Sequence, residues 1–129
     1  AGGEARLAGG SDGAWSSRAV GDGDHGVEVR RLQFDTPDSA ADYVDTMAVH
    51  AMAQLEAIAG SPVASGALTE LDVTGGSGLR LRLWFDLLAT HREVTSVWAR
   101  RGTTVVEVLA LNAHPTDGRL RRALDMGLR

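Results

Sequence analysis

The acidic turn at residues 21–26 is the first place in the chain where side chains could do chemistry. Asp22 and Asp24 are spaced like the first two ligands of an EF-hand calcium loop. Such a loop needs a glycine at its sixth position and a bidentate glutamate at its twelfth, and those positions hold Val27 and Gln33. We therefore predict a solvated turn, closed by glycines and aspartates, and no calcium site.

Other reactive residue types lack the spacing that catalysis needs. No two histidines have the i, i+4 spacing of a helical metal site. The serine at position 77 lacks the G-x-S-x-G pattern of a nucleophile elbow, and the glycine-rich residues 74–78 have no lysine after them to hold a phosphate. The four histidines are His25, His50, His91 and His114. We therefore predict no catalytic residue, no metal and no cofactor.

One group of residues does favour binding. If the strands alternate regularly, Arg80, Arg82 and Trp84 leave the core side of one strand, and Trp98 and Arg100 leave the core side of the next. Guanidinium groups stack on indoles and bind carboxylates with two hydrogen bonds. On this interpretation the five residues form one exposed sheet face that could hold an anionic or aromatic ligand.

Two other interpretations of this sheet face remain open. The indoles could lie under the N-terminal segment or the closing helix, with Glu107 pairing with an arginine across strands. The face could also contact a protein partner or a second copy of the chain, because Trp and Arg are enriched at interfaces. A contrasting hypothesis is a small cytoplasmic enzyme or accessory subunit, in which His50, Tyr43 and Arg82 converge in a pocket between sheet and helix.

Composition limits the classes of partner. The net charge of −4 argues against nucleic acid and against an anionic membrane surface, so membrane contact is expected only through an anchor outside this sequence. The absence of cysteine excludes disulfides, cysteine zinc sites and thiol catalysis. All 13 basic side chains are arginine. With abundant Ala and Gly, this suggests a high-GC, actinobacterial source.

The pattern of apolar residues and turn signals predicts the elements that position these side chains. Thr36 as N-cap and Pro37 at the first helical position begin a helix that runs to about Ala59. Strands are predicted at 14–20, 27–34, 67–73, 79–85, 94–101 and 103–112, with a closing helix at 118–128. The connection at 86–93 has no clear form. In the strand at 27–34 the apolar parity changes midway, which predicts a bulge near Arg30 and Arg31.

These elements predict an α+β fold. An antiparallel sheet of about five to six strands follows the order β-β-α-β-β-β-β-α, with both helices packed on one face. Residues 1–13 are predicted to be a flexible lead-in, and residues 14–129 a single domain.

The layout of two segments resembles a known group of proteins. The first is the strand-to-helix junction at 34–40, and the second is the pair of strands around the Arg-Gly turn at 97–108. Together with the final helix, they are similar to sensor-type domains of actinobacterial surface proteins, including extracellular domains of mycobacterial receptor Ser/Thr kinases and related cell-wall lipoproteins. The sensor domains of those kinases characteristically carry disulfides, which this chain lacks. The resemblance implies an extracytoplasmic, non-enzymatic domain that binds a ligand or a protein partner, and it supplies no site residue.

Overall fold

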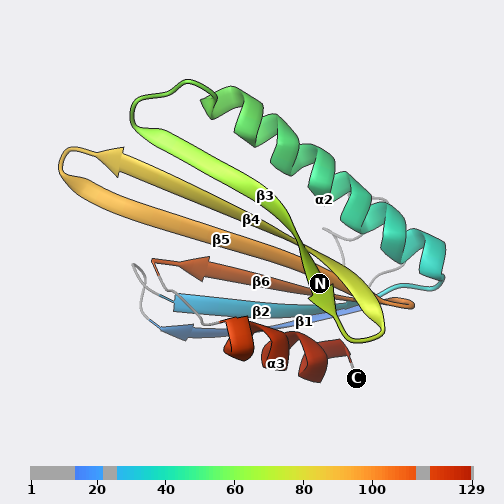
Figure 1. The fold of residues 1–129 in the computed structure, drawn as a ribbon. Helices are drawn as coiled ribbons and strands as arrows, with labels where there is room; N and C mark the ends of the chain where they lie inside the picture. The colour runs from blue at the N-terminus through green and yellow to red at the C-terminus, as the bar shows by residue number, and fades with distance from the viewer. Residues whose placement is uncertain (1–13, 22–25, 113–116, 129) are drawn as a thin grey trace.

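The structure of the chain is a computed structural model that describes residues 14–21, 26–112 and 117–128. It consists of an antiparallel sheet packed against helices (Figure 1). The elements are β1 (Ala14–Gly21), β2 (Gly26–Gln33), α2 (Pro37–Ile58), β3 (Ala64–Val73), β4 (Gly76–Leu87), β5 (Thr90–Arg101), β6 (Thr104–Leu111) and α3 (Asp117–Leu128). The predicted α+β class and element order are confirmed. The proposed lead-in at 1–13, the acidic turn and His114 lie outside the described residues.

All six strands belong to one antiparallel sheet in the order β1-β2-β6-β5-β4-β3. The last strand in sequence, β6, lies in the middle, because it pairs with β2 on one side and with β5 on the other. The strands from β3 to β6 form a meander, in which each strand pairs with the next one in sequence. β6 carries apolar residues on both faces, as expected for a central strand, with Glu107 as its one charged residue.

The connection whose form the sequence leaves open is a tight hairpin. β4 continues to Leu87 and β5 begins at Thr90, so only two residues turn the chain. Leu88 and Ala89 have φ values of 50° and 64°, in the left-handed region that both turn residues of a type I′ hairpin occupy. The β4–β5 hairpin reaches past the neighbouring end of β6 (Figure 1).

The bulge predicted in β2 is wrong. Pairing with both neighbours is continuous from Gly26 to Gln33, so the strand alternates regularly. Val27 and Val29 pack with the cluster around α3, and Leu32 packs with the cluster around α2. Since each face of the sheet carries a helix, both parities of the strand can be apolar without an extra residue.

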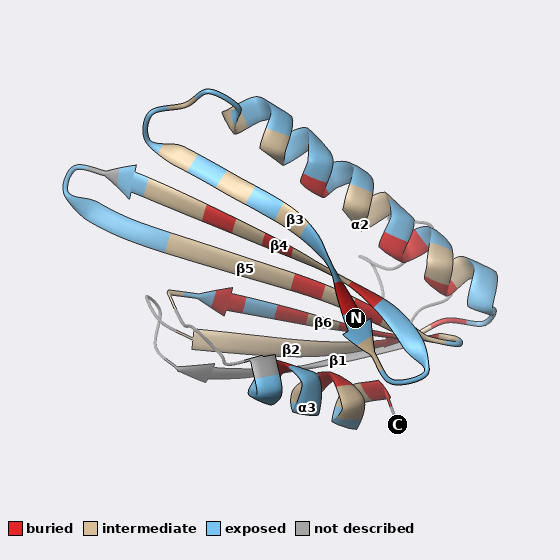
Figure 2. Cartoon of the chain, viewed as in Figure 1, coloured by how far each residue is buried: buried red, intermediate tan, exposed pale blue. Residues whose placement is uncertain are grey.

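The two helices cover opposite faces of the sheet, which corrects the prediction that they share one. Val105 contacts the cluster of Tyr43 and Val44 from α2, whereas the next residue, Val106, contacts Leu124 and other residues of α3. Successive strand residues point to opposite faces, so the helices lie on different sides. Figure 2 shows buried residues on both helices and along the central strands.

Each helix comes close to the sheet at a glycine. A Cβ on Gly66 of β3 would lie 2.7 Å from Leu55 of α2, and a Cβ on Gly127 of α3 would lie 2.6 Å from Val106 of β6. The start of α2 is also as predicted, since the Thr36 hydroxyl accepts a hydrogen bond from the Ser39 amide at 3.1 Å. Among the described helices, none is long and apolar enough to cross a membrane.

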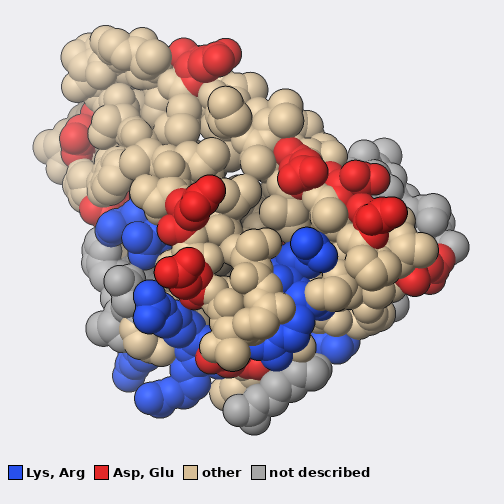
Figure 3. Space-filling model, turned by 45° about the vertical axis from the view of Figure 1, so that its right-hand side comes forward, with Lys and Arg blue, Asp and Glu red and all other residues tan. Residues whose placement is uncertain are grey.

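Charge is distributed unevenly between the two helices. The acidic residues of α2 are Asp38, Asp42, Asp45 and Glu56, and this helix has no arginine or lysine. The closing helix α3 exposes Arg119, Arg121 and Arg122. On the face drawn in Figure 3, the arginines gather over the lower half and most acidic side chains lie above them. The α2 side of the molecule is therefore the more acidic side.

Candidate functional site

A cavity of about 400 Å³ lies between α2 and the neighbouring face of the sheet. Its volume is within the range of small-ligand sites. Its lining comes from α2, β2, β5 and β6, and consists of Glu28, Arg30, Tyr43, Met47, His50, Ser96, Trp98, Glu107, Val108 and Leu109. We call it the α2 cavity.

Helix periodicity and strand register bring these residues together. Tyr43, Met47 and His50 are four and three residues apart on α2, so they lie along one side of the helix. In the sheet, Glu107 of β6 pairs with Trp98 of β5 on one side and with Arg30 of β2 on the other. Paired residues of adjacent strands project to the same face, so these three side chains form a row beneath the helix.

Polar contacts along this row fix the position of Glu107. The Tyr43 hydroxyl donates a hydrogen bond to Glu107 Oε1, and Arg30 Nη1 lies 3.8 Å from Glu107 Oε2. Arg30 Nε donates to Glu28 Oε1 at 2.7 Å. The Glu107 side chain is only 14% exposed. A carboxylate in the middle of the sheet is therefore held by a hydroxyl from the helix and faces a guanidinium from the next strand.

The rest of the α2 cavity is mostly apolar. Trp98 packs against both clusters beneath α2, and Met47 packs against the cluster that contains Tyr43. The Tyr43 ring lies against Phe34, with ring centroids 5.4 Å apart. These contacts hold the two aromatic side chains of the cavity, Tyr43 and Trp98, in position. A ligand here would meet an indole, a thioether and an aliphatic wall, with polar groups gathered along one side.

The five residues predicted from the sequence to form one binding face are divided between the two faces. Trp98 packs beneath α2, whereas Val97 belongs to the α3 cluster. Register places Arg100 on the same face as Trp98, and Arg80, Arg82 and Trp84 on the face of α3. The predicted stacking of arginine on indole does occur, since the Arg82 guanidinium lies 5.4 Å from the Trp84 ring centroid. The combined surface does not form, because the register of β4 with β5 places the two groups of residues on opposite faces of the sheet.

The pocket predicted under the enzyme hypothesis, with His50, Tyr43 and Arg82, is formed only in part. Tyr43 and His50 both line the α2 cavity, but Arg82 lies on the opposite face of the sheet. The guanidinium of the cavity belongs to Arg30, and its carboxylates to Glu28 and Glu107. The sequence singled out neither Arg30 nor Glu28, whereas the pairing of Glu107 with an arginine across strands, one of the interpretations left open, does occur with Arg30 of β2. Charged residues within apolar strands were the available signal, since Glu107 interrupts a run of valines.

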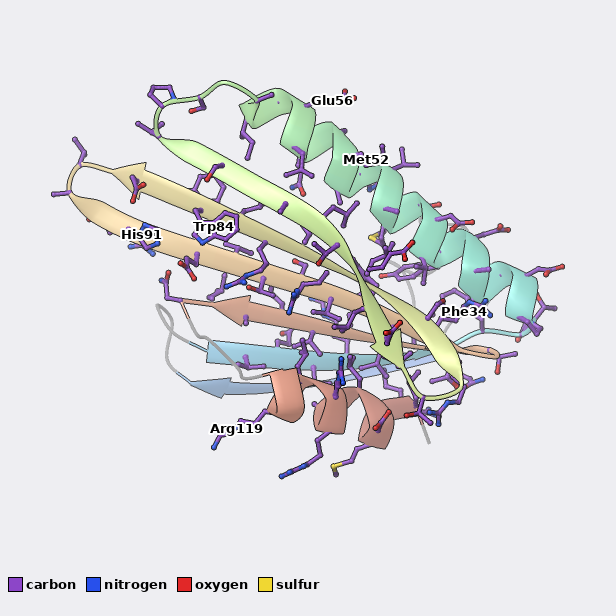
Figure 4. All side chains as sticks on the ribbon, viewed as in Figure 1. Phe34, Met52, Glu56, Trp84, His91 and Arg119 are labelled. Atoms are coloured by element: carbon purple, nitrogen blue, oxygen red, sulfur yellow. The ribbon has the colours of Figure 1, made fainter. Side chains whose placement is uncertain are left out.

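A second polar cluster lies near the end of the β4–β5 hairpin, on the α3 face with Trp84 (Figure 4). The His91 ring contacts Asp86 Oδ1 through Nδ1 at 2.5 Å and Glu93 Oε1 through Nε2 at 3.0 Å. These hydrogen bonds, first to Asp86 and then to Glu93, raise the pKa of His91 above its ordinary value. Within the described parts of the chain, no three His, Asp or Glu side chains are arranged to hold a metal ion.

Known structures offer a likeness in fold. No family model and no curated protein matches the sequence. The extracellular domain of PknH from Mycobacterium tuberculosis is similar, with a TM-score of 0.50 and 19% identity over 89% of this chain and 62% of that chain. PA94 from Pseudomonas aeruginosa, a protein of unknown function, gives a TM-score of 0.43 and 11% identity over 79% of this chain and 70% of that chain.

The likeness to PknH concerns the fold alone, at this level of identity. The chain spans less than two thirds of the PknH domain. The sequence-based resemblance to extracellular sensor domains is thus supported at the level of the fold. It transfers no ligand, partner or site residue to this chain.

Proposed function

We propose that the chain is a non-enzymatic sensor or binding domain of the cell envelope, and that it holds a small amphipathic ligand in the α2 cavity. The observation that carries the proposal is the composition of that cavity. An indole, a thioether and an aliphatic side chain surround the ligand space, while Tyr43, Glu107 and Arg30 form a fixed polar side. Small-ligand sites combine apolar walls with a few placed polar groups in this way.

The contacts of the polar groups favour recognition over a reaction. Tyr43 is buried and donates to Glu107, and the ring is held by Phe34. Groups held before the ligand arrives lose little entropy on binding, which increases affinity. The likeness in fold to an extracellular domain supports a place outside the cytoplasmic membrane. Fractionation of source cells with an antiserum against the chain tests the compartment.

Methionine methyl groups provide a direct test of the cavity. The chain has three methionines: Met47 lines the α2 cavity, whereas Met52 and Met126 are 55% and 63% exposed elsewhere. With ¹³C-methyl methionine, we expect amphipathic fragments from a mixed library to shift the Met47 signal and leave the other two in place. Met52 is a close control, because it lies on the same helix (Figure 4). A library that contains no compound able to shift Met47 would refute the proposal.

A further inference from the structure

We propose that the outer side of α2 binds the outer side of α3 from a second copy of the chain. This contact is separate from the α2 cavity, which lies between α2 and the sheet. The two helices lie on opposite faces of the sheet and form the outermost layers of the molecule (Figure 1). Each copy therefore presents both surfaces at once, and the contact between copies is head-to-tail.

The outer side of α2 carries one stripe of exposed residues. Its members are three or four positions apart, so they follow one side of the helix: Asp38, Asp42, Asp45, Val49, Met52 and Glu56. The first half of this outer α2 stripe is acidic, and an apolar pair follows. Val49 and Met52 are 63% and 55% exposed, and Glu56 points away from the sheet in Figure 4. The stripe therefore leaves apolar surface in water beside a row of carboxylates.

The outer side of α3 repeats part of this pattern with the opposite charge. The helix packs on the sheet through Leu120, Leu124 and Leu128. Away from the sheet it exposes three residues that are three and four positions apart: Arg119, Arg122 and Met126. Met126 is 63% exposed, and Arg119 points away from the sheet in Figure 4. The order along this outer α3 stripe is basic, basic, apolar, where the outer α2 stripe has acidic, acidic, apolar.

A parallel arrangement of the two helices matches the stripes position by position. In this arrangement Arg122 lies opposite Asp45. Four residues further along each helix, or about 6 Å, Met126 then lies opposite Val49. Three residues before Arg122 and Asp45, the two helices again carry charges of opposite sign. No ion pair within the described residues engages Asp45 or Arg122, so both charges are available to a partner.

The two kinds of contact would contribute differently. Exposed ion pairs add little free energy, so their main effect is to select the partner helix and its direction. Burial of Val49 against Met126 supplies attraction. A contact of this size belongs with weak, transient interfaces, so the association should become visible at high protein concentration.

Methionine methyl signals report directly on this contact. Met52 belongs to the outer α2 stripe and Met126 to the outer α3 stripe, whereas Met47 lines the α2 cavity. Spectra of the ¹³C-methyl methionine protein would be recorded from about 10 μM to about 1 mM, a range that covers weak association. We expect the signals of Met52 and Met126 to shift with concentration and that of Met47 to stay in place.

Charge reversals at exposed positions then locate the contact. Asp45→Arg and Arg122→Glu each place like charges opposite each other, so each variant should associate about tenfold more weakly than the wild type. An equimolar mixture of the two variants brings opposite charges together again and should regain the association. The matched control is Arg121→Glu, which changes the net charge as Arg122→Glu does, at an exposed position about 100° around the same helix.

The possible outcomes decide the proposal without reference to the ligand of the cavity, which is read at Met47. Association that is weakened in both reversals, regained in their mixture and kept in Arg121→Glu supports it. Signals of Met52 and Met126 that do not change with concentration overturn it. Association that survives both reversals, or that falls equally in Arg121→Glu, also overturns it, because the two stripes would then not form the contact.

Discussion

Glu107 is the residue on which the account of the cavity depends most. It is a carboxylate in a central strand, with valines on both sides in sequence and only 14% of its side chain exposed. A charge in such a place is costly unless it is hydrogen-bonded and paired. Tyr43 and Arg30 supply those contacts. The polar side of the cavity is therefore also a condition of the fold's stability.

Removal of the Tyr43 hydroxyl should show how much its hydrogen bond to Glu107 contributes to the stability of the fold. Tyr43→Phe keeps the ring against Phe34 and deletes the hydrogen bond to Glu107. A hydrogen bond to a charged group contributes about 1.5–3 kcal/mol, so the free energy of unfolding in urea should fall by about that amount. The slope of the denaturation curve should not change, because the same surface is exposed on unfolding. An unchanged midpoint would show that Tyr43 does not support Glu107.

At the scale of the elements, the β4–β5 hairpin is held near its end by polar contacts around His91. The ring lies between Asp86 on β4 and Glu93 on its own strand, at 2.5 and 3.0 Å. The contact between the strands supplements a turn whose two residues, Leu88 and Ala89, are both left-handed. Side chains other than glycine resist that conformation, so the turn itself adds strain.

The stability of the hairpin should depend on the protonation of His91. Its pKa is raised in the folded chain, so its contribution is fully present below the ordinary value of 6.5 and is lost as the pH rises through the higher folded value. Thermal unfolding should therefore show the wild type losing stability relative to His91→Gln as the pH rises from below 6.5 through the higher folded pKa. His50→Gln, on α2, is the control. A constant difference across this range would contradict the predicted linkage.

The elements themselves were largely predictable from the sequence. Local signals such as Thr36 and Pro37 begin α2 where predicted, and strict alternation places β4. The side of the sheet that each residue faces was not predictable. Val97 and Trp98 are adjacent and both suit a core, yet Val97 is buried in the cluster of α3 while Trp98 packs against the cluster of α2. The prediction assumed that only one face of the sheet is buried, and it therefore grouped Trp98 with Arg80, Arg82 and Trp84, which lie on the other face. The row formed by Arg30, Glu107 and Trp98 depends on the pairing of β2 with β6, a contact distant in sequence that no local pattern reveals.

On the scale of the whole molecule, the two sheet faces offer different surfaces for binding. The α2 face encloses a cavity with a carboxylate and an indole, and the helix above it is acidic. The α3 face carries Arg82 stacked on Trp84 near the end of the β4–β5 hairpin. That stacked pair remains a candidate for contact with a protein partner, as the sequence suggested. The proposed ligand binds on the α2 face, in the α2 cavity.

Fluorine NMR of the protein labelled with 5-fluorotryptophan would test this placement most directly. The chain has three tryptophans; Trp98 lines the α2 cavity and Trp84 lies on the α3 face, so one spectrum reports on both surfaces. Single Trp→Phe replacements assign the signals. During titration with an amphipathic fragment that shifts the Met47 signal, we expect a saturable shift of the Trp98 resonance and an unchanged Trp84 resonance. A shift of Trp84 with none at Trp98 would contradict this placement.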